Sequence, residues 1–307
     1  QLSIIKINHS SFFHPFLPDG GNPHRETLHF IRTFDGNKYF KDEDGSCFRA
    51  YRFVDNSKAY DTVDSAEVFG KSGKAFGRFQ KYLSDFPAES LSEIIKNFHN
   101  TIWRYENEFI PAVQADKADR AVNCGEEIKF VMHRREDCKK LVELIEKGEL
   151  PLRVTHNDTK LNNVLFDSDS DDAICVIDLD TVMPGLSAYD FGDAIRYGAS
   201  TGAEDEPDLS LVDLDLEMYA AFARGFLEAC PSLTEREIEV LPLGAYTMTV
   251  ECGMRFLTDY INGDVYFAID RETHNLDRAR TQFKLVRDME RHWDDMRRII
   301  TEISAKR

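Results

Sequence analysis

The sequence has no apolar run that approaches the roughly 18 residues a helix needs to cross a bilayer, and no signal-peptide pattern near its start. It also lacks any C-x-x-C pair among its 6 cysteines, whose spacing is scattered. Scattered cysteines in a chain of this length are typical of reduced, mostly buried thiols in a cytosolic protein. We therefore expect a protein of the cytoplasm, with no disulfide framework and no membrane partner.

Positive charge is scarce in this chain. Lysine and arginine total 38 against 55 aspartate and glutamate residues, so the formal net charge is −17. A chain this acidic repels phosphate backbones and anionic lipids, so we do not expect nucleic acid as a partner. It would also repel ATP at long range, and a nucleotide site would therefore need magnesium and local cations.

Apolar material, by contrast, is sufficient for a sizeable core. Of the 307 residues, 42% are hydrophobic, which suits one large domain or two packed lobes. Residues 1–55 are predicted to form a small antiparallel sheet. Its evidence is a strand pattern at Leu2–Ile7, a Pro- and Gly-rich loop over 8–26, and strand-like runs at Thr27–Thr33, Asn37–Lys41 and Cys47–Val54, with turns at Asp35-Gly36 and Asp44-Gly45.

The apolar spacing changes to a helical period after Asp64. Helices are predicted near 66–86, 91–101 and 136–147, and again from Glu217 onward, with one last helix across 276–300. A short β-rich insert interrupts them at Leu152–Thr155, Val164–Phe166 and Ile174–Asp178. The predicted fold class is therefore α+β, with a small antiparallel β lobe in residues 1–55 and a larger, mainly helical lobe in residues 56–307.

A polar cluster lies within the β-rich insert. Residues 155–166 read T-H-N-D-T-K-L-N-N-V-L-F, and V-I-D-L-D-T follows. A hairpin between the two apolar runs would bring Asn163, at the start of one strand, beside Asp178, at the end of the other. Both would then lie next to Asp158, and we expect the cluster to face the cleft between the two lobes.

These residue types match the needs of phosphoryl transfer. That reaction needs a carboxylate to orient the attacking hydroxyl and accept its proton, oxygen ligands for magnesium, and a cation near the transferring group. Asp158 suits the first role, Asn163 and Asp178 the second, and Lys160 the third. Asp180 suits either an outer or second metal ligand or a hydrogen-bonding role in the following loop.

The pattern H-x-D-x-K-x-x-N followed by an apolar I-D resembles the protein-kinase-like superfamily, in its aminoglycoside phosphotransferase and choline kinase branch. Together with V-I-D-L-D-T-V-M-P-G and Y-D-F-G-D-A-I-R, it is similar to bacterial N-acetylhexosamine 1-kinases. The resemblance implies a bilobal kinase-like fold, with the nucleotide on the side of residues 1–55. It also implies that the acceptor binds to residues 56–307, which carry the catalytic loop and the metal-binding hairpin.

The resemblance also implies roles for single residues. Asp158 matches the catalytic base, Lys160 the lysine near the γ-phosphate, and Asn163 and Asp178 the magnesium ligands. His156 matches a histidine that braces the catalytic loop. Asp190, in Y-D-F-G-D, matches an acidic residue that orders the backbone. All of these roles are what the resemblance implies.

Residues outside the motif match more loosely. Arg255 and Tyr266 resemble sugar-contacting residues, although a helix salt bridge and an aromatic core contact are alternative interpretations. Lys6, in I-I-K-I, resembles the strand lysine that holds the α- and β-phosphates, although an isolated strand lysine is common. No glycine-rich loop precedes Lys6 and no helix supplies its glutamate partner, so we expect an incomplete N-terminal lobe in this sequence. Adenine contacts are expected from the backbone around Arg52–Asp55.

The predicted function is a small-molecule kinase that uses ATP and Mg²⁺. Its expected acceptor is a sugar hydroxyl, and the resemblance favours the anomeric hydroxyl of an N-acetylhexosamine. An aminoglycoside or choline-type acceptor is the alternative within the same class. Two alternatives belong to other classes: a kinase-like binding module without activity, which the missing glycine loop favours, and a haloacid-dehalogenase-type phosphatase, which D-L-D-T-V at Asp178 favours.

Overall fold

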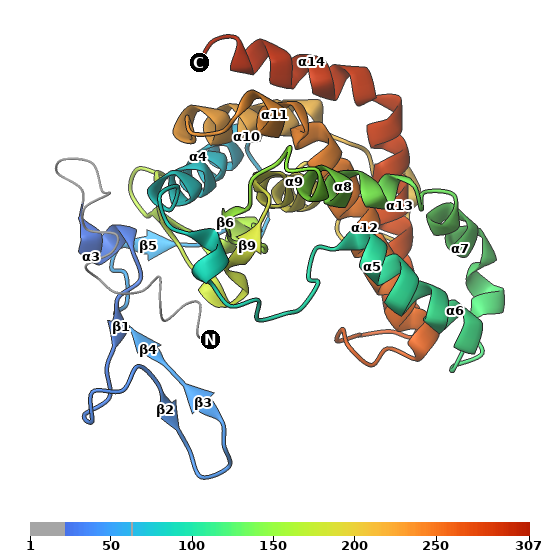
Figure 1. Ribbon diagram of the computed structural model, residues 1–307, viewed down its shortest axis with the longest axis horizontal. Coiled ribbons are helices and arrows are strands. Elements are labelled where there is room, and N and C mark those ends of the chain that lie inside the picture. Colours follow the sequence, from blue (N-terminus) through green and yellow to red (C-terminus); the bar gives the residue numbers. More distant parts are fainter. Residues whose placement is uncertain (1–21, 63) are drawn as a thin grey trace.

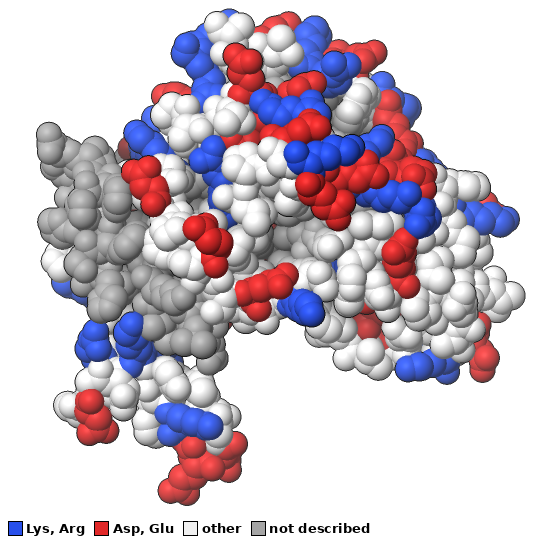
Figure 2. All heavy atoms as spheres, in the orientation of Figure 1, with Lys and Arg blue, Asp and Glu red and all other residues white. Residues whose placement is uncertain are grey.

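A computed structural model describes residues 22–62 and 64–307 (Figure 1). The strand predicted at Leu2–Ile7 and the candidate phosphate-binding Lys6 lie outside the described residues. No helix within the described ranges is both long enough and apolar enough to pass through a membrane. On the face shown in Figure 2, acidic and basic side chains are interspersed over the helical part.

The N-terminal part is built from short strands, as the turn signals predicted. A short helix, α3 (Pro23–Glu26), precedes them. The strands form two antiparallel pairs, β1 (Phe30–Ile31) with β4 (Ala50–Tyr51) and β2 (Phe40–Lys41) with β3 (Cys47–Phe48). These pairs project from the helical body in Figure 1. The predicted turns are confirmed, since both of their glycines adopt a positive φ, 78° at Gly36 and 86° at Gly45.

Helices α4 (Ala66–Tyr82) and α10 (Leu216–Ala229) lie side by side in Figure 1. Ser65 caps the start of α4 by accepting a hydrogen bond from the Val68 backbone. Glycines allow the close approach of the two helices: a Cβ on Gly73 would lie 2.5 Å from the carbonyl oxygen of Phe222. The backbones therefore pack almost directly against each other, and α4 becomes a rigid support.

The remaining helices form the body around α12 (Leu241–Asn262). In chain order the others are α5 (Thr101–Arg104), a π-helical turn (Tyr105–Phe109), α6 (Ile110–Ala115), α7 (Gly125–Met132), α8 (Lys140–Glu146), α9 (Ser187–Gly198), α11 (Glu235–Glu239), α13 (His274–Arg291) and α14 (Trp293–Ser304). Helix α12 packs against both α9 and α13, so it lies centrally in the larger hydrophobic core. The mixed architecture confirms the predicted α+β fold class.

Two helix predictions were wrong. The segment 91–100 is irregular, and α5 begins only at Thr101, where the Asn100 side chain caps it. Helical spacing of apolar residues misled the prediction there, because Asn97 adopts a left-handed φ of 57°, which a helix cannot contain. The single last helix is in fact α13 and α14, because the backbone breaks at His292 (φ −100°, ψ 18°).

The β-rich insert is a hairpin, as predicted. Strand β7 (Val164–Asp167) pairs antiparallel with β8 (Ala173–Val176), and β5 (Ser57–Lys58) extends this sheet along β7. Strand β6 (Arg153–Thr155) pairs instead with β9 (Met183–Gly185), a strand that the sequence pattern did not indicate. A second apolar cluster beneath these strands includes Phe79 of α4 and Leu83, the residue that directly follows α4. The hairpin therefore rests on α4. Strand β5, which lies just after the proposed lobe boundary at residue 55, connects the N-terminal part of the chain to this hairpin.

Candidate active site

The segment between β6 and β7, residues 156–163, is held in place by Asp190 of α9. The backbone amides of His156 and Asn157 donate to the two oxygens of Asp190, at 3.0 and 2.8 Å, and the Gln80 side chain donates at 2.7 Å. Burial raises the pKa of Asp190, and these donated hydrogen bonds oppose that rise. Asn157 itself has a left-handed φ of 65°, a conformation that asparagine tolerates. Asp190 thus orders the backbone immediately before Asp158.

His156 connects this loop to the end of β8. Its Nε2 lies 2.8 Å from the Ile177 carbonyl oxygen, and the Asp158 backbone amide donates to its Nδ1 at 3.3 Å. Because Nδ1 accepts a hydrogen bond, the ring proton is placed on Nε2, which gives the neutral tautomer. The ring is fully buried and packs edge-on against Phe76 and Phe79 of α4. The side chain therefore has a bracing position and does not reach the solvent.

Asp158 and Asn163 are brought into direct contact. The Asn163 Nδ2 donates both to the Asp158 carbonyl oxygen at 2.9 Å and to its carboxylate at 3.1 Å. Both amide hydrogens are thereby used, and the Asn163 side-chain oxygen accepts no hydrogen bond from the described residues. The Asp158 side chain is about one-third exposed, at 29%. It is thus both positioned and accessible to a substrate.

Lys160 supplies a cation beside this carboxylate. Its Nζ lies 3.6 Å from an Asp158 oxygen. Burial alone would lower the pKa of Lys160, but attraction to Asp158, Asp193 and Glu204 outweighs both burial and the repulsion from Arg196, so the pKa is raised. Lys160 therefore keeps its positive charge at neutral pH.

The hairpin register places Asp178 next to Asn163. The Ile177 amide donates to the Asn163 carbonyl oxygen at 2.9 Å, and Asp178 is the next residue, with a left-handed φ of 54°. Magnesium prefers oxygen ligands and keeps sites open for phosphates and water. The free Asn163 amide oxygen and the Asp178 carboxylate fit this preference. No group of three or more His, Cys, Asp or Glu side chains suited to a metal occurs in the described ranges, so further ligands would come from nucleotide phosphates and water.

Asp180 has a different partner. One of its oxygens forms an ion pair with Arg49, which lies between β3 and β4. Burial lowers the pKa of Arg49, although attraction to Asp178 opposes the shift. A metal-ligand role for Asp180 would require this ion pair to open. Arg49 itself was not among the residues that the sequence singled out.

A cavity of about 390 Å³ brings four predicted site residues together. Asp158 and Lys160 line it from the catalytic loop, Arg255 from α12, and Tyr266 from the loop that follows α12. Tyr266 is 69% exposed, so it is not a core residue. Arg255 forms no ion pair within residues 22–62 and 64–307. Neither alternative interpretation of these two residues is therefore supported.

The Arg255 guanidinium is surrounded by aromatic rings. It lies 5.3 Å from the ring centre of Phe98, 5.9 Å from that of Tyr266 and 5.4 Å from that of Phe267. These distances fit cation–π contacts. The protein's own cation thus occupies the aromatic wall of the cavity.

Sequence reasoning missed an ionic cluster on α9 that also lines the cavity. The Thr159 amide donates to Asp193 at 2.9 Å, and Arg196 pairs with Asp193 at 3.0 Å and with Glu204 at 2.6 Å. The spacing of Asp190 and Asp193 contained the signal, because residues three apart share one face of a helix. Both carboxylates hold the catalytic loop from that face.

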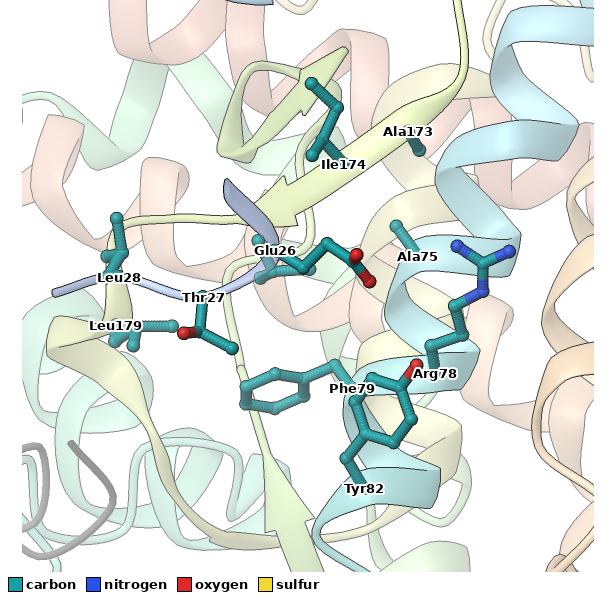
Figure 3. A pocket seen from close by; sticks show the side chains of 11 residues that line it. Glu26, Thr27, Leu28, Ala75, Arg78, Phe79, Tyr82, Ala173, Ile174 and Leu179 are labelled. Carbon is teal, nitrogen blue, oxygen red and sulfur yellow. The ribbon is translucent and has the colours of Figure 1, made fainter. Parts of the chain in front are cut away.

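A much smaller cavity lies between the Glu26–Leu28 segment, β8 and α4 (Figure 3). Glu26 and Thr27 face Arg78, Phe79 and Tyr82 across it. Its volume of about 50 Å³ is far below the roughly 300 Å³ or more of typical ligand pockets. It shares no lining residue with the larger cavity, and we assign it no ligand.

Comparison with known proteins agrees with this geometry. The model of the phosphotransferase enzyme family matches residues 30–228, and the chain belongs to that family. The fold is that of an aminoglycoside phosphotransferase from Alicyclobacillus acidocaldarius, with a TM-score of 0.58, 12% identity, and 95% of this chain and 82% of that chain covered.

Two further solved structures share the fold. A microcompartment-associated aminopropanol kinase has a TM-score of 0.57 and 15% identity, with 92% of this chain and 85% of that one covered. A choline kinase from Cryptosporidium parvum has a TM-score of 0.55 and 13% identity, with 98% and 81% covered. The chain is therefore a member of the phosphotransferase enzyme family with the fold of these kinases. The haloacid-dehalogenase alternative is wrong, since the chain after Asp178 is mainly helical and belongs to this family.

Proposed function

We propose that this protein transfers the γ-phosphoryl group of ATP to the anomeric hydroxyl of an N-acetylhexosamine, with Mg²⁺. The observation that carries the proposal is the shared cavity of Asp158, Lys160, Arg255 and Tyr266. A candidate base and a candidate acceptor wall thus face the same space, as transfer to a bound hydroxyl requires.

The charges around the cavity favour a neutral acceptor. Asp193 and Glu204 both pair with Arg196 and are also attracted to Lys160, and Arg255 and Arg278 line the cavity without a carboxylate partner in the described part of the chain. The Arg278 Nε is buried and finds no acceptor there either. A choline-like cation would meet these arginines and an aromatic wall that Arg255 already occupies. A sugar with a carbonyl oxygen would instead satisfy the unused donors.

The proposed chemistry divides among the residues of the site. Asp158 aligns the acceptor hydroxyl and accepts its proton as the phosphoryl group leaves ATP. Lys160 offsets negative charge on the transferring group, and Asn163 and Asp178 hold the metal with their oxygens. Magnesium, when bound, neutralises the phosphates. Asp190 and His156 keep the loop in place throughout.

The nucleotide side of the proposal has less support. Lys6 is kept as the proposed α- and β-phosphate contact, and the backbone of Arg52–Asp55 as the proposed adenine contact. Residues 1–55 are proposed as the nucleotide lobe, residues 56–307 as the acceptor lobe, and the cytoplasm as the location. Asp180 is kept as a second metal ligand that Arg49 would release when the nucleotide binds.

An ADP-release assay tests the proposed acceptor. N-acetylhexosamines, hexoses, choline and aminoglycosides are compared at equal concentration, and we expect N-acetylhexosamines to give the highest kcat/KM. Turnover of choline or an aminoglycoside alone would instead favour the choline and aminoglycoside alternative, which the fold of the related structures supports. A thermal-shift titration with Mg-ATP distinguishes the inactive binding module: absence of any shift at millimolar nucleotide would favour it.

A further inference from the structure

One face of α12 carries three charged residues at intervals of one helical turn: Glu251, Arg255 and Asp259. Residues four apart lie above one another on a helix. Arg255 faces the acceptor cavity directly, whereas Glu251 and Asp259 are buried carboxylates, 0% and 4% exposed. Burying a charge is costly unless it is paired. The partners of these two carboxylates therefore indicate what they do.

Glu251 is connected to the catalytic loop through His99. The His99 Nδ1 lies 2.8 Å from a Glu251 oxygen, and its Nε2 lies 3.4 Å from the Asn157 carbonyl oxygen, one residue before Asp158. A carboxylate only accepts hydrogen bonds, so the His99 Nδ1 donates to Glu251, while its Nε2 faces the Asn157 carbonyl at a longer distance. Burial would raise the pKa of Glu251, but His99, Arg104 and Thr101 outweigh it and hold the pKa below its ordinary value.

Asp259 holds the other wall of the cavity. Its Oδ1 accepts from the backbone amides of Val265 and Tyr266 at 3.0 and 2.9 Å, and its Oδ2 accepts from the Phe267 amide at 2.9 Å. The Asn275 side chain donates a fourth hydrogen bond at 3.1 Å. Three successive amides on one carboxylate fix the loop whose rings flank Arg255. Tyr266 cannot shift over the cavity unless these bonds break.

We propose that His99, held by Glu251, and Asp259 are separate positioning residues for the two walls of the acceptor cavity. His99 sets the position of Asp158 and therefore governs kcat, whereas Asp259 sets the position of Tyr266 and therefore governs the KM of the acceptor. This division of roles rests on the proposed function, because it assumes that the acceptor binds between the two walls.

Two variants separate the roles by steady-state kinetics. His99→Asn keeps a donor for Glu251 and removes the Nε2 contact with the Asn157 carbonyl, and we expect kcat to fall about 10–100-fold with the acceptor KM nearly unchanged. Asp259→Asn turns an N–H group toward backbone N–H donors, and we expect the acceptor KM to rise roughly tenfold with kcat nearly unchanged. His99→Gln, whose amide reaches the Nε2 position, is expected to recover part of kcat. The proposal would be overturned if both variants showed the same fall in kcat and the same rise in the acceptor KM.

Amide hydrogen exchange gives a readout that needs no substrate. In Asp259→Asn the amides of residues 265–267 should lose protection while those of Asn157 and Thr159 keep it, and in His99→Asn the order should reverse. This pattern without any sugar turnover would refute the proposed function and leave the positioning roles standing. Sugar turnover with uniform exchange changes would refute the positioning roles alone. Should His99→Asn fail to fold, His99→Gln decides the case, since a raised acceptor KM with an unchanged kcat in that variant would contradict the proposal.

Discussion

The Asn163 side chain donates hydrogen bonds to both the carbonyl and the carboxylate oxygen of Asp158, at 2.9 and 3.1 Å. One amide group therefore ties a candidate metal ligand to the candidate base. The amide nitrogen is fully used in this way, which leaves the amide oxygen for a cation. The position of the base and the binding of metal are thus coupled through a single side chain.

Replacing Asp158 by Asn should remove the base and little else. We expect kcat to fall by about 10²–10⁴-fold with a melting temperature close to that of the wild type, because the carboxylate is partly exposed and its loop is held by Asp190. Asp294→Asn, an exposed position on α14 outside the cavity, is the matched control and should keep full activity. Near-normal turnover by Asp158→Asn would refute the assignment of the base.

Replacing Arg255 by Gln should change the acceptor preference. The KM for a neutral sugar should rise roughly tenfold or more, since a guanidinium in the cavity wall is lost, while the KM for ATP stays near its wild-type value. The aromatic faces of Phe98, Tyr266 and Phe267 become free, so tetramethylammonium should become a better competitive inhibitor. An unchanged sugar KM would show that Arg255 does not contact the acceptor.

The ion pair between Arg25 and Asp167 should make the free energy of unfolding depend on pH under acidic conditions. Arg25 donates to Asp167 at 2.9 Å, and this contact, together with two backbone amides, lowers the pKa of Asp167 to about 2. Because the folded pKa lies below the unfolded one, the pair stabilises the fold above about pH 4, and its contribution is lost as the pH falls toward about 2. An NMR titration should show the low pKa in the wild type and a rise toward the ordinary value in Arg25→Gln. An unshifted value in the wild type would contradict the contact.

The close packing of α4 on α10 predicts a cost for one added methyl group. Gly73→Ala would place a Cβ 2.5 Å from the Phe222 carbonyl oxygen, and such overpacking lowers the free energy of unfolding by about 1–3 kcal/mol. Gly125→Ala, at the start of α7, meets no atom within 4 Å and should be neutral or slightly stabilising. Urea denaturation of the two variants checks the contrast, and equal stabilities would argue against the helix contact.

Local sequence signals were enough to predict the hairpin and the residues it joins. Strands β7 and β8 are separated by a short acidic turn, so the register that places Asp178 beside Asn163 follows from sequence proximity. The turns at Gly36 and Gly45 were equally readable, because glycine marks a positive φ. The features set by residues close together in the sequence, namely the hairpin and the turns, were therefore predicted correctly.

Long-range pairings were not predictable from one sequence. The contact of His99 with Glu251 joins residues 152 positions apart, and β6 pairs with β9 across the whole hairpin. Segment 91–100 shows helical apolar spacing, yet its backbone is not helical. Its residue His99 instead contacts Glu251 and Asn157. Arg49 likewise meets Asp180 only in the folded protein. No local pattern encodes such contacts, because they are decided by tertiary packing.

Phosphorus NMR of the reaction product tests the proposed chemistry most directly. Wild-type protein, Mg-ATP and N-acetylglucosamine or N-acetylgalactosamine are incubated together, with Asp158→Asn as the inactive control. We expect a new phosphomonoester signal coupled to the anomeric proton of the sugar, together with an equal amount of ADP. A phosphate ester formed only on choline or an aminoglycoside, with none on either sugar, would contradict the proposal.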